Sequence, residues 1–142
     1  MLNFKRYYLG RCNSLSEKTL LTEINTILRG LEINYYYMVN DSAPIIYPYV
    51  VGEYHEIGYS YEDNATIGEM LLNAWARGTE SDLIDIKDLV KDGFKNYQTV
   101  ISEDNKKTAI AINYIGKSAR YTGEEDLKRI EIRLETKYWE SD

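Results

Sequence analysis

The chain has 142 residues and a formal net charge of −6, with 44% hydrophobic and 28% charged residues. This length and composition fit one compact domain with its own core and exclude wholesale disorder. The negative charge argues against a nucleic-acid coat or a protein bound to an anionic membrane, since phosphate groups attract positive surfaces. We expect no membrane-crossing run and no secretory signal, and the single Cys12 excludes an internal disulfide. The expected setting is a reducing cytoplasm.

Tyrosine is unusually frequent, with 14 Tyr against two Phe and two Trp. Because Tyr buries a flat ring while its hydroxyl stays hydrated, such an excess suits half-exposed sheets and contact surfaces. The preference of Tyr for strands explains the excess equally well. Composition alone leaves both interpretations open.

The sequence has neither internal repeats nor Pro- or Gly-rich linkers, so residues 1–142 are predicted to form a single domain. Residues 1–12 are basic and aromatic, and they are predicted to form an N-terminal arm or short strand rather than part of a helix. An α+β core is expected over residues 13–142. Such an arm either docks onto a partner subunit or frays, as chain termini commonly do.

A first helix is predicted from Ser14, which has the spacing of a capping box with Glu17. Gly30 is placed to end this helix. Apolar residues from Leu20 to Leu31 recur at three- and four-residue intervals along one face. They are Leu20, Leu21, Ile24, Ile27, Leu28 and Leu31.

Three strands are predicted next, over residues 35–39, 45–61 and 67–76. The second is rich in β-branched and aromatic residues, although Pro48 cannot donate a hydrogen bond to a neighbouring strand. Its glycines, Gly52 and Gly58, indicate bulges or bends. The third strand is predicted to pair back onto residues 49–61.

A second helix is predicted to begin with Ser81 as its cap. Its apolar face would contain Leu83, Ile86, Leu89, Val90 and Phe94. After a polar loop at 103–107, two more strands are predicted over residues 108–115 and 127–139, the last with strict alternation of apolar and charged residues. The order α-β-β-β-α-β-β predicts an α+β domain, an antiparallel or mixed sheet with two helices packed on one face.

The residues that carry chemistry are few. His55 would share a strand face with Glu53, which is too little for a metal site and provides no nucleophile. Asp82, Asp85 and Asp88 follow one another at three-residue intervals and are interpreted as a solvated helix face. We therefore predict no catalytic, cofactor-binding or metal-binding residues, and no enzyme.

Several short motifs resemble the tail-terminator and head–tail joining proteins of long-tailed phages. The first is the PYVVGE segment from Pro48 to Glu53, followed by Trp75 and Arg77 at the end of the next strand. The others are the acidic and apolar helix residues from Asp85 to Val90 and the strand pair that ends with Gly123 to Trp139. The resemblance covers about residues 14–139.

This resemblance implies a structural virion protein that forms a ring, usually of six copies, at the top of the tail tube. Its partners would be further copies of itself, the tail tube protein and the head connector proteins, and it would bind no membrane. DNA would pass through the lumen without specific binding. The implied location is the tail of the virion, after assembly in the host bacterial cytoplasm.

A second interpretation remains open: a small acidic inhibitor, such as an immunity or anti-defence protein, that binds a protein target. Mixed charges along residues 129–137 suit subunit pairing better than mimicry of a nucleic acid. Within the ring interpretation, the candidate contact residues are Tyr59, Tyr61, Trp75, Arg77 and Trp139. Trp75 suits the core as well as an interface, since Trp is mostly buried on average.

Overall fold

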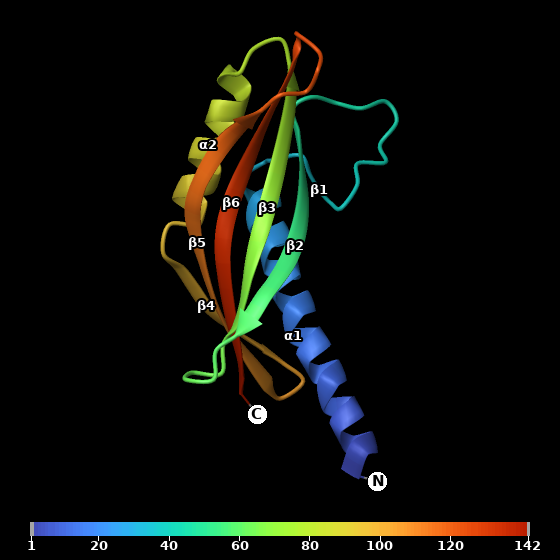
Figure 1. Cartoon of the computed structure of the whole chain (residues 1–142), viewed down its shortest axis with the longest axis vertical. Coiled ribbons are helices and arrows are strands. Elements are labelled where there is room, and N and C mark those ends of the chain that lie inside the picture. Colours follow the sequence, from blue (N-terminus) through green and yellow to red (C-terminus); the bar gives the residue numbers. More distant parts are fainter. Residues whose placement is uncertain (1, 142) are drawn as a thin grey trace.

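The computed structural model describes the backbone of residues 2–141 and the side chains of residues 16–140. Over these residues the chain forms two helices and six strands (Figure 1). They are α1 (Leu2–Gly30), β1 (Tyr35–Tyr37), β2 (Tyr49–Tyr59), β3 (Thr66–Arg77), α2 (Ser81–Gly93), β4 (Tyr97–Glu103), β5 (Lys106–Arg120) and β6 (Leu127–Ser141). The predicted α+β class is confirmed.

The strands form one mixed sheet in the order β1-β2-β3-β6-β5-β4. The short β1 runs parallel to β2, and the other neighbours pair antiparallel. The predicted pairing of the second and third strands is confirmed by β2 and β3. A register shift between Glu56 and Gly58 confirms the bulge expected at Gly58.

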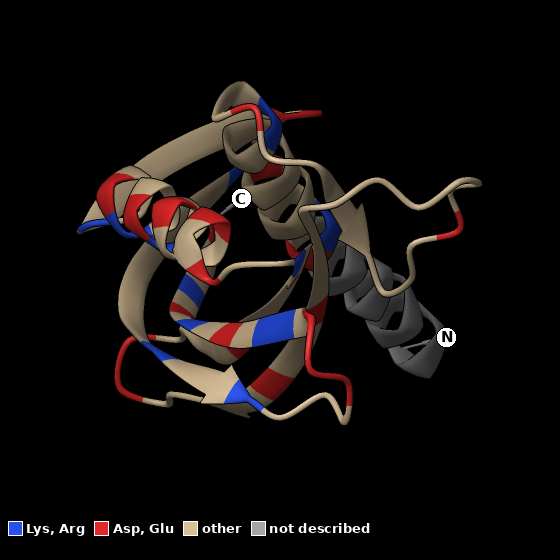
Figure 2. Cartoon of the chain, turned by 90° about the horizontal axis from the view of Figure 1, so that it is seen from above, with Lys and Arg blue, Asp and Glu red and all other residues tan. Residues whose placement is uncertain are grey.

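The sheet is strongly curled, and α1 lies inside the curl. Near one edge of the sheet, Arg29 Nη2 of α1 donates to the carbonyl oxygen of Tyr35 in β1 at 2.8 Å. At the opposite edge, the hydroxyl of Tyr97 in β4 donates to Glu23 of α1 at 2.7 Å. One helix therefore touches both edge strands, which is possible because the sheet bends around it (Figure 2).

The core fills the concave face of the sheet, and both helices pack there. Three residues of α1, spaced four residues apart on one face of the helix, are fully buried: Leu20, Ile24 and Leu28. They join one cluster with the buried residues of α2 and with alternate residues of the strands. On β6 these alternate residues are Ile130, Ile132, Leu134, Thr136 and Tyr138. The predicted alternation of β6 is confirmed, and the charged residues between the buried ones, at 129, 131, 133, 135 and 137, lie on the convex face.

Two glycines make room for tyrosine rings on the concave face. A Cβ atom at Gly52 would overlap the side chain of Tyr35, and a Cβ atom at Gly68 would overlap that of Tyr54. Each ring therefore lies across a bare stretch of backbone on the neighbouring strand. A strand glycine at such a position permits close approach rather than a bend.

The start of the first helix differs from the prediction. Because α1 begins at Leu2, residues 2–12 are helical, and the prediction that they lie outside a helix is wrong. Ser14 and Glu17 have capping-box spacing, but both residue types are also tolerated inside a helix, and no proline precedes them. The side chains of residues 1–15, Cys12 among them, lie outside the described residues.

The strand boundaries also differ. The long strand begins at Tyr49 rather than residue 45, because Pro48 cannot donate to a ladder, and residues 38–48 form a loop. Strand β4, Tyr97–Glu103, was not predicted, since its alternation is short and mixed in polarity. It adds a fifth antiparallel strand to the sheet and becomes one of its edges.

The second helix starts where expected but is capped differently. Glu80, not Ser81, occupies the N-cap position of α2. Leu83, Ile86 and Val90 are buried as predicted, whereas Leu89 is exposed. Leu89 lies at the margin of the apolar stripe, where the curved sheet leaves the helix uncovered.

Candidate interaction surfaces

The five candidate contact residues lie in two groups at opposite ends of the sheet. Trp75 and Arg77 end β3, whereas Tyr59 and Tyr61 lie where β2 turns back toward the start of β3. Trp139, near the end of β6, belongs to the second group, because its neighbour Tyr138 pairs with Thr66. From Thr66 to Arg77, β3 makes 11 steps of about 3.3 Å, so the groups lie about 36 Å apart measured along the strand.

Trp75 and Arg77 belong to a ladder of aromatic and arginine side chains on the convex face. We call it the aromatic–arginine ladder, and its members are Tyr47, Tyr49, Trp75, Arg77 and Arg129. The register places Tyr49 and Arg129 directly on either side of Trp75. The rings of Tyr49 and Trp75 stack with centroids 5.2 Å apart, and the ring of Tyr47 lies 5.4 Å from that of Tyr49.

Guanidinium groups lie at both ends of this ladder. Arg129 Cζ lies 5.1 Å from the centroid of Trp75, and Arg77 Cζ lies 5.3 Å from that of Tyr47. Asn73 Oδ1 accepts hydrogen bonds from Nε and Nη2 of Arg129 at 3.2 and 2.7 Å, which orients the guanidinium over the indole. Such cation–π contacts favour a charged group on a half-buried ring. Trp, Tyr and Arg are also the residue types that dominate interface energetics.

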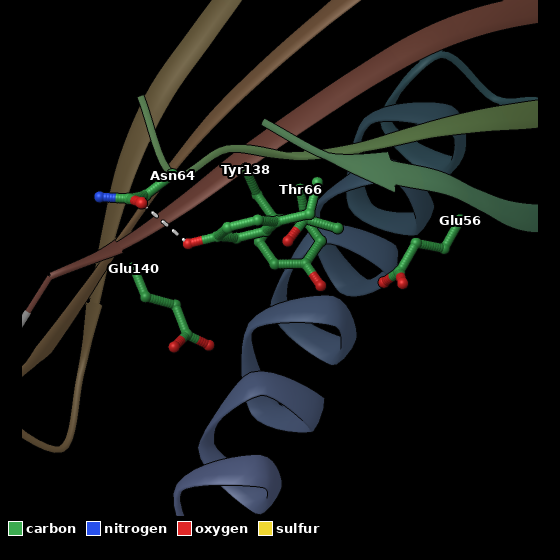
Figure 3. A pocket seen from close by; sticks show the side chains of 6 residues that line it. Glu56, Asn64, Thr66, Tyr138 and Glu140 are labelled. Atoms are coloured by element: carbon green, nitrogen blue, oxygen red, sulfur yellow. Dashed lines mark hydrogen bonds between the residues drawn. The ribbon is translucent and has the colours of Figure 1, made fainter. Parts of the chain in front are cut away.

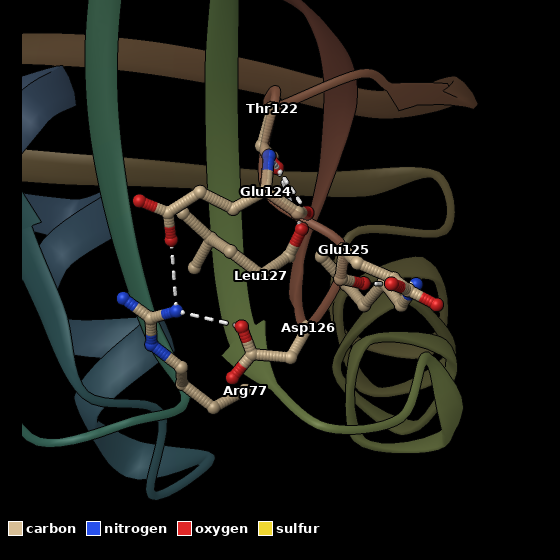
Figure 4. A network of polar contacts seen from close by, with 7 residues as sticks. Arg77, Thr122, Glu124, Glu125, Asp126 and Leu127 are labelled. Atoms are coloured by element: carbon tan, nitrogen blue, oxygen red, sulfur yellow. Dashed lines mark hydrogen bonds and ion pairs between the residues drawn. The ribbon is translucent and has the colours of Figure 1, made fainter.

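Arg77 is held in place by the turn between β5 and β6 (Figure 4). Its Nη1 donates to Glu124 Oε2 at 2.9 Å and to Asp126 Oδ1 at 3.0 Å. The hydrogen bond to Glu124 is the main cause that raises the pKa of Arg77. Within the turn, the hydroxyl of Thr122 donates to the carbonyl oxygen of Leu127 at 2.7 Å. The turn therefore supports the cationic end of the ladder.

The second group is built around the turn between β2 and β3. The rings of Tyr59 and Tyr61 meet edge to face, with centroids 5.4 Å apart, and the Tyr59 hydroxyl donates to Asn64 Oδ1 at 3.0 Å. Hydrogen bonds from Ser60, from the Ala65 backbone and from Trp139 lower the pKa of Asp63. Trp139 therefore lies close to this turn.

A polar pocket of about 520 Å³ lies beside the same turn (Figure 3). Its lining consists of Glu56, Tyr59, Asn64, Thr66, Tyr138 and Glu140. Burial is the main cause that raises the pKa of Tyr138, and the nearby carboxylates of Glu56 and Glu140 raise it further. The pocket offers acceptor oxygens to a donor-rich or cationic group.

A shallow apolar groove lies on the convex face beside the edge strand β4. We call it the β4 groove; it encloses about 320 Å³ and is lined by Gln98, Thr99, Val100, Ala109, Ile110, Ala111 and Trp139. The side chains of Ala109 and Ala111 are short, so they form the floor of the groove. Val100, which is 61% exposed, forms one side of the groove. Trp139, which pairs with Ala109, forms the other side.

The loop over residues 38–48 presents apolar side chains to solvent. Met38, Val39, Ile45 and Ile46 are between 47% and 64% exposed. The loop is nevertheless tied down, because Met38 N donates to the carbonyl oxygen of Gly52 at 2.8 Å and Asn40 Oδ1 accepts from the backbone and hydroxyl of Ser42. We call residues 38–48 the apolar loop. In Figure 1 this loop projects beside β1 and β2.

Charged side chains on the convex face pair partly with one another. Arg133 Nη2 donates to Glu69 Oε2 at 3.0 Å, and Arg120 Nη2 donates to Glu131 Oε1 at 2.9 Å. His55 Nε2 lies 3.4 Å from Glu53 Oε2, and this confirms that the two residues share a face. His55 is exposed, and Glu53 is half-buried.

Neither metal sites nor membrane spans stand out in the part of the chain that the structure describes. Within residues 16–140, His, Cys, Asp and Glu side chains do not gather in groups of three or more that would hold a metal ion. Neither described helix combines the length and apolar character of a membrane span.

Comparison with known protein families finds no matching family, and a search of curated proteins finds no significant match.

Several members of these surfaces cannot be predicted from the sequence. Tyr49 and Arg129 join the ladder through cross-strand register, which no local pattern reveals. The β4 groove depends on a strand that was not predicted. The apolar loop did carry a signal, because Ile45 and Ile46 lie between Pro44 and Pro48, where a strand is disfavoured.

Proposed function

We propose that this chain is a structural virion protein, a phage tail terminator or head–tail joining protein that forms a ring at the top of the tail tube. Its partners in that role are further copies of itself, the tail tube protein and the head connector proteins. DNA passes through the lumen of the ring without specific binding. The protein acts in the virion tail and is assembled in the host bacterial cytoplasm.

The motif segments behind the resemblance support this proposal because they converge in space. Tyr49, from the PYVVGE segment, stacks on Trp75, and Arg77 lies over the ring of Tyr47, just before that segment. The C-terminal motif contributes Arg129, which covers the other face of Trp75. Three segments that are distant in the sequence thus build one half-exposed surface.

The observation that carries the proposal is the placement of the contact surfaces. The aromatic–arginine ladder and the apolar loop lie toward one end and one edge of the sheet, whereas the β4 groove and Trp139 lie toward the opposite end and edge. Two different surfaces on opposite sides of one chain suit head-to-tail contacts between copies. Contacts of this heterologous kind build rings when the rotation between copies closes.

The mass of the protein in solution tests this proposal. Sedimentation velocity and native mass spectrometry over a wide concentration range should reveal a closed species of about 100 kDa, six copies of the 16.6 kDa chain. Electron microscopy of that species should reveal a ring with a central hole. A protein that stays monomeric at every concentration, and that does not bind tail tubes, would contradict the proposal.

Two tryptophan variants sharpen the same test. Trp75→Ala and Trp139→Ala should weaken assembly at least tenfold, because each removes an aromatic side chain from one of the two surfaces. Tyr121→Ala is the matched control, since Tyr121 is 93% exposed in the segment between β5 and β6 and lies outside both surfaces. Circular dichroism and thermal unfolding would establish that each variant is folded. A folded Trp139→Ala variant that still assembles normally would argue against its role in contacts.

A second candidate function is favoured by the exposed acidic residues of α2 (Figure 2). Glu80, Asp82, Asp85, Asp88 and Asp92 are all exposed. Such a stripe would suit a small acidic inhibitor that covers a basic surface of a protein target. Capture of a basic partner in a one-to-one complex, lost when Asp82, Asp85 and Asp88 are all replaced by Asn, would favour this function over the ring.

A further inference from the structure

We propose that the apolar loop of one copy docks into the β4 groove of a second copy. The inference rests on the ring proposed above and names the contact that joins neighbouring subunits. It follows from two solvent-exposed apolar features of one chain, the apolar loop and the β4 groove, which lie at opposite edges of the same sheet.

The loop has the properties of a docking element. Four large aliphatic or thioether side chains are exposed within nine residues, with Ile46 64% exposed and Val39 62% exposed. Their exposure to water is unfavourable, and clusters of exposed apolar residues mark interaction sites. Hydrogen bonds at Met38, Asn40 and Asn34, whose side-chain amide donates to the carbonyl oxygen of Ile46 at 3.4 Å, keep the loop ordered. Docking such a preordered loop costs little conformational entropy.

The groove has a complementary shape and chemistry. Ala109 and Ala111 form an apolar floor between Val100 and the indole of Trp139, and the volume of about 320 Å³ accommodates aliphatic side chains. Within the described residues, the outer edge of β4 pairs with no other strand. A neighbouring copy can therefore approach this edge without displacing any element of the fold.

Charge complementarity supports a second copy as the occupant. The loop contains one charged residue, the exposed Asp41. Two lysines flank the groove on the convex face: Lys137 pairs with Ala111 across the sheet, and Lys107 lies two residues before Ala109 on β5. An apolar loop with one carboxylate thus meets an apolar hollow bordered by two lysines, and Asp63, the acidic residue beside both Lys137 and Trp139, belongs to the turn on the far side of Trp139 from the groove floor. Each copy offers both halves of the contact.

The loop of the same copy does not fill the groove. The hydrogen bond from Met38 N to Gly52 and that from Asn34 to Ile46 tie the loop beside β1 and β2, while the groove lies across β4, β5 and β6. The contact must therefore be made between copies. Because loop and groove are different surfaces, each contact leaves one free loop and one free groove for the next copy.

Disulfide trapping between full-length chains tests the contact directly. In a Cys12→Ser background, Ile46→Cys and Val100→Cys chains are mixed and oxidised, and the covalent dimer is measured without reductant. The mixture, in which the new cysteine at position 46 of one chain can bond to that at position 100 of another, should form several-fold more covalent dimer than either chain forms when it is oxidised alone. Ile57→Cys replaces Ile46→Cys in the matched control, because Ile57 is 65% exposed but lies in β2, outside the loop. Equal trapping by the control, or Ile46–Ile46 dimers as the main product, would overturn the inference.

A charge substitution separates this contact from the ring itself. Ile46→Asp should raise the concentration needed for assembly at least tenfold, whereas Ile57→Asp should not, with both variants folded by circular dichroism. If the wild-type protein assembles and Ile46→Asp assembles equally well, the docking is wrong, the loop serves another partner, and the ring stands. If the trapped dimer forms but no closed species is found, the contact stands and the ring is wrong. If the wild-type chain does not assemble and the mixed Ile46→Cys and Val100→Cys chains form no trapped dimer, both the contact and the ring are overturned.

Discussion

The concave and convex faces of the curled sheet differ in composition and burial, although both are formed by the same strands. On the concave face, alternate residues of β3 and β6, such as Leu72 and Ile132, are fully buried against the helices. On the convex face, the residues between them include Glu69, Arg133 and the half-exposed Trp75. One residue of shift along a strand changes a side chain from core to surface.

This difference separates stability from recognition. Burial of apolar area on the concave face is the main source of folding free energy. The convex face contributes through ring stacking, cation–π contacts and exposed ion pairs. Each of these adds less to the free energy of folding than the burial of a large apolar side chain. Substitutions on the concave face should therefore reduce the free energy of unfolding most, and substitutions on the convex face should act mainly on contacts between copies.

The largest effect is expected at Leu72. Leu72→Ala should reduce the free energy of unfolding by about 2–5 kcal/mol, since it leaves a cavity beneath a fully buried side chain. Its neighbour on the opposite face, Leu71, is half-buried, so Leu71→Ala should cost less than half as much. Urea unfolding of both variants measures the difference. Equal losses would mean that both faces are covered in the folded protein.

A smaller loss is expected where glycine makes room for an aromatic ring. Gly68→Ala should destabilise the protein by about 1–3 kcal/mol, because the new methyl group would overlap the ring of Tyr54. Gly58→Ala is the matched control on the same sheet, since the described residues leave open space around a Cβ atom there. Thermal unfolding compares the two variants. An unchanged midpoint for Gly68→Ala would contradict the close approach of the Tyr54 ring.

Alkaline pH should weaken the concave face through its tyrosines. Burial is the main cause that raises the pKa of Tyr54 to about 12, against 10.0 for an ordinary Tyr. The unfolded chain loses this proton first as pH rises, so the contribution of Tyr54 to stability is complete below pH 10 and is lost between about pH 10 and 12. Urea unfolding at a series of pH values measures the loss. Tyr54→Phe should reduce the slope in this interval, and identical slopes would argue against the assignment.

The smallest effect on stability is expected from the ion pairs on the convex face. Arg77→Gln removes contacts with Glu124 and Asp126, but all three side chains are largely exposed to solvent. Exposed pairs contribute little, and about 1 M NaCl should abolish the contribution that remains. Chemical unfolding at low and high salt tests this expectation. A loss as large as that of Gly68→Ala would mean that Arg77 supports the fold rather than a contact surface.

The sequence predicted those features that repeat along the chain. The face of α1 that contains Leu20, Ile24 and Leu28 follows from helical spacing, and the buried face of β6 follows from strict alternation. The bulge at Gly58 follows from local conformational preference. These features depend on neighbours within a few residues, so a single sequence is sufficient to predict them.

Candidate contact residues could be predicted only by type. Trp75 and Arg77 are candidate contact residues within the ring interpretation, and the structure places them in one ladder with Tyr47, Tyr49 and Arg129. Trp139 is another such candidate, but its position beside the β4 groove depends on a strand with weak local signals. Residue type thus identified members of the surfaces but not their composition or shape.

The sequence by itself determined both helical regions, the strands other than β4, and which face of α1 and β6 is apolar, because hydrophobic periodicity is a local property. Only the tertiary structure decided the strand order, the curl of the sheet around α1 and the opposite placement of the apolar loop and the β4 groove. These depend on register between segments as distant as Trp75 and Arg129, where pairing energy is shared among many residues. Local patterns specify the elements, and packing of the common core specifies how they meet.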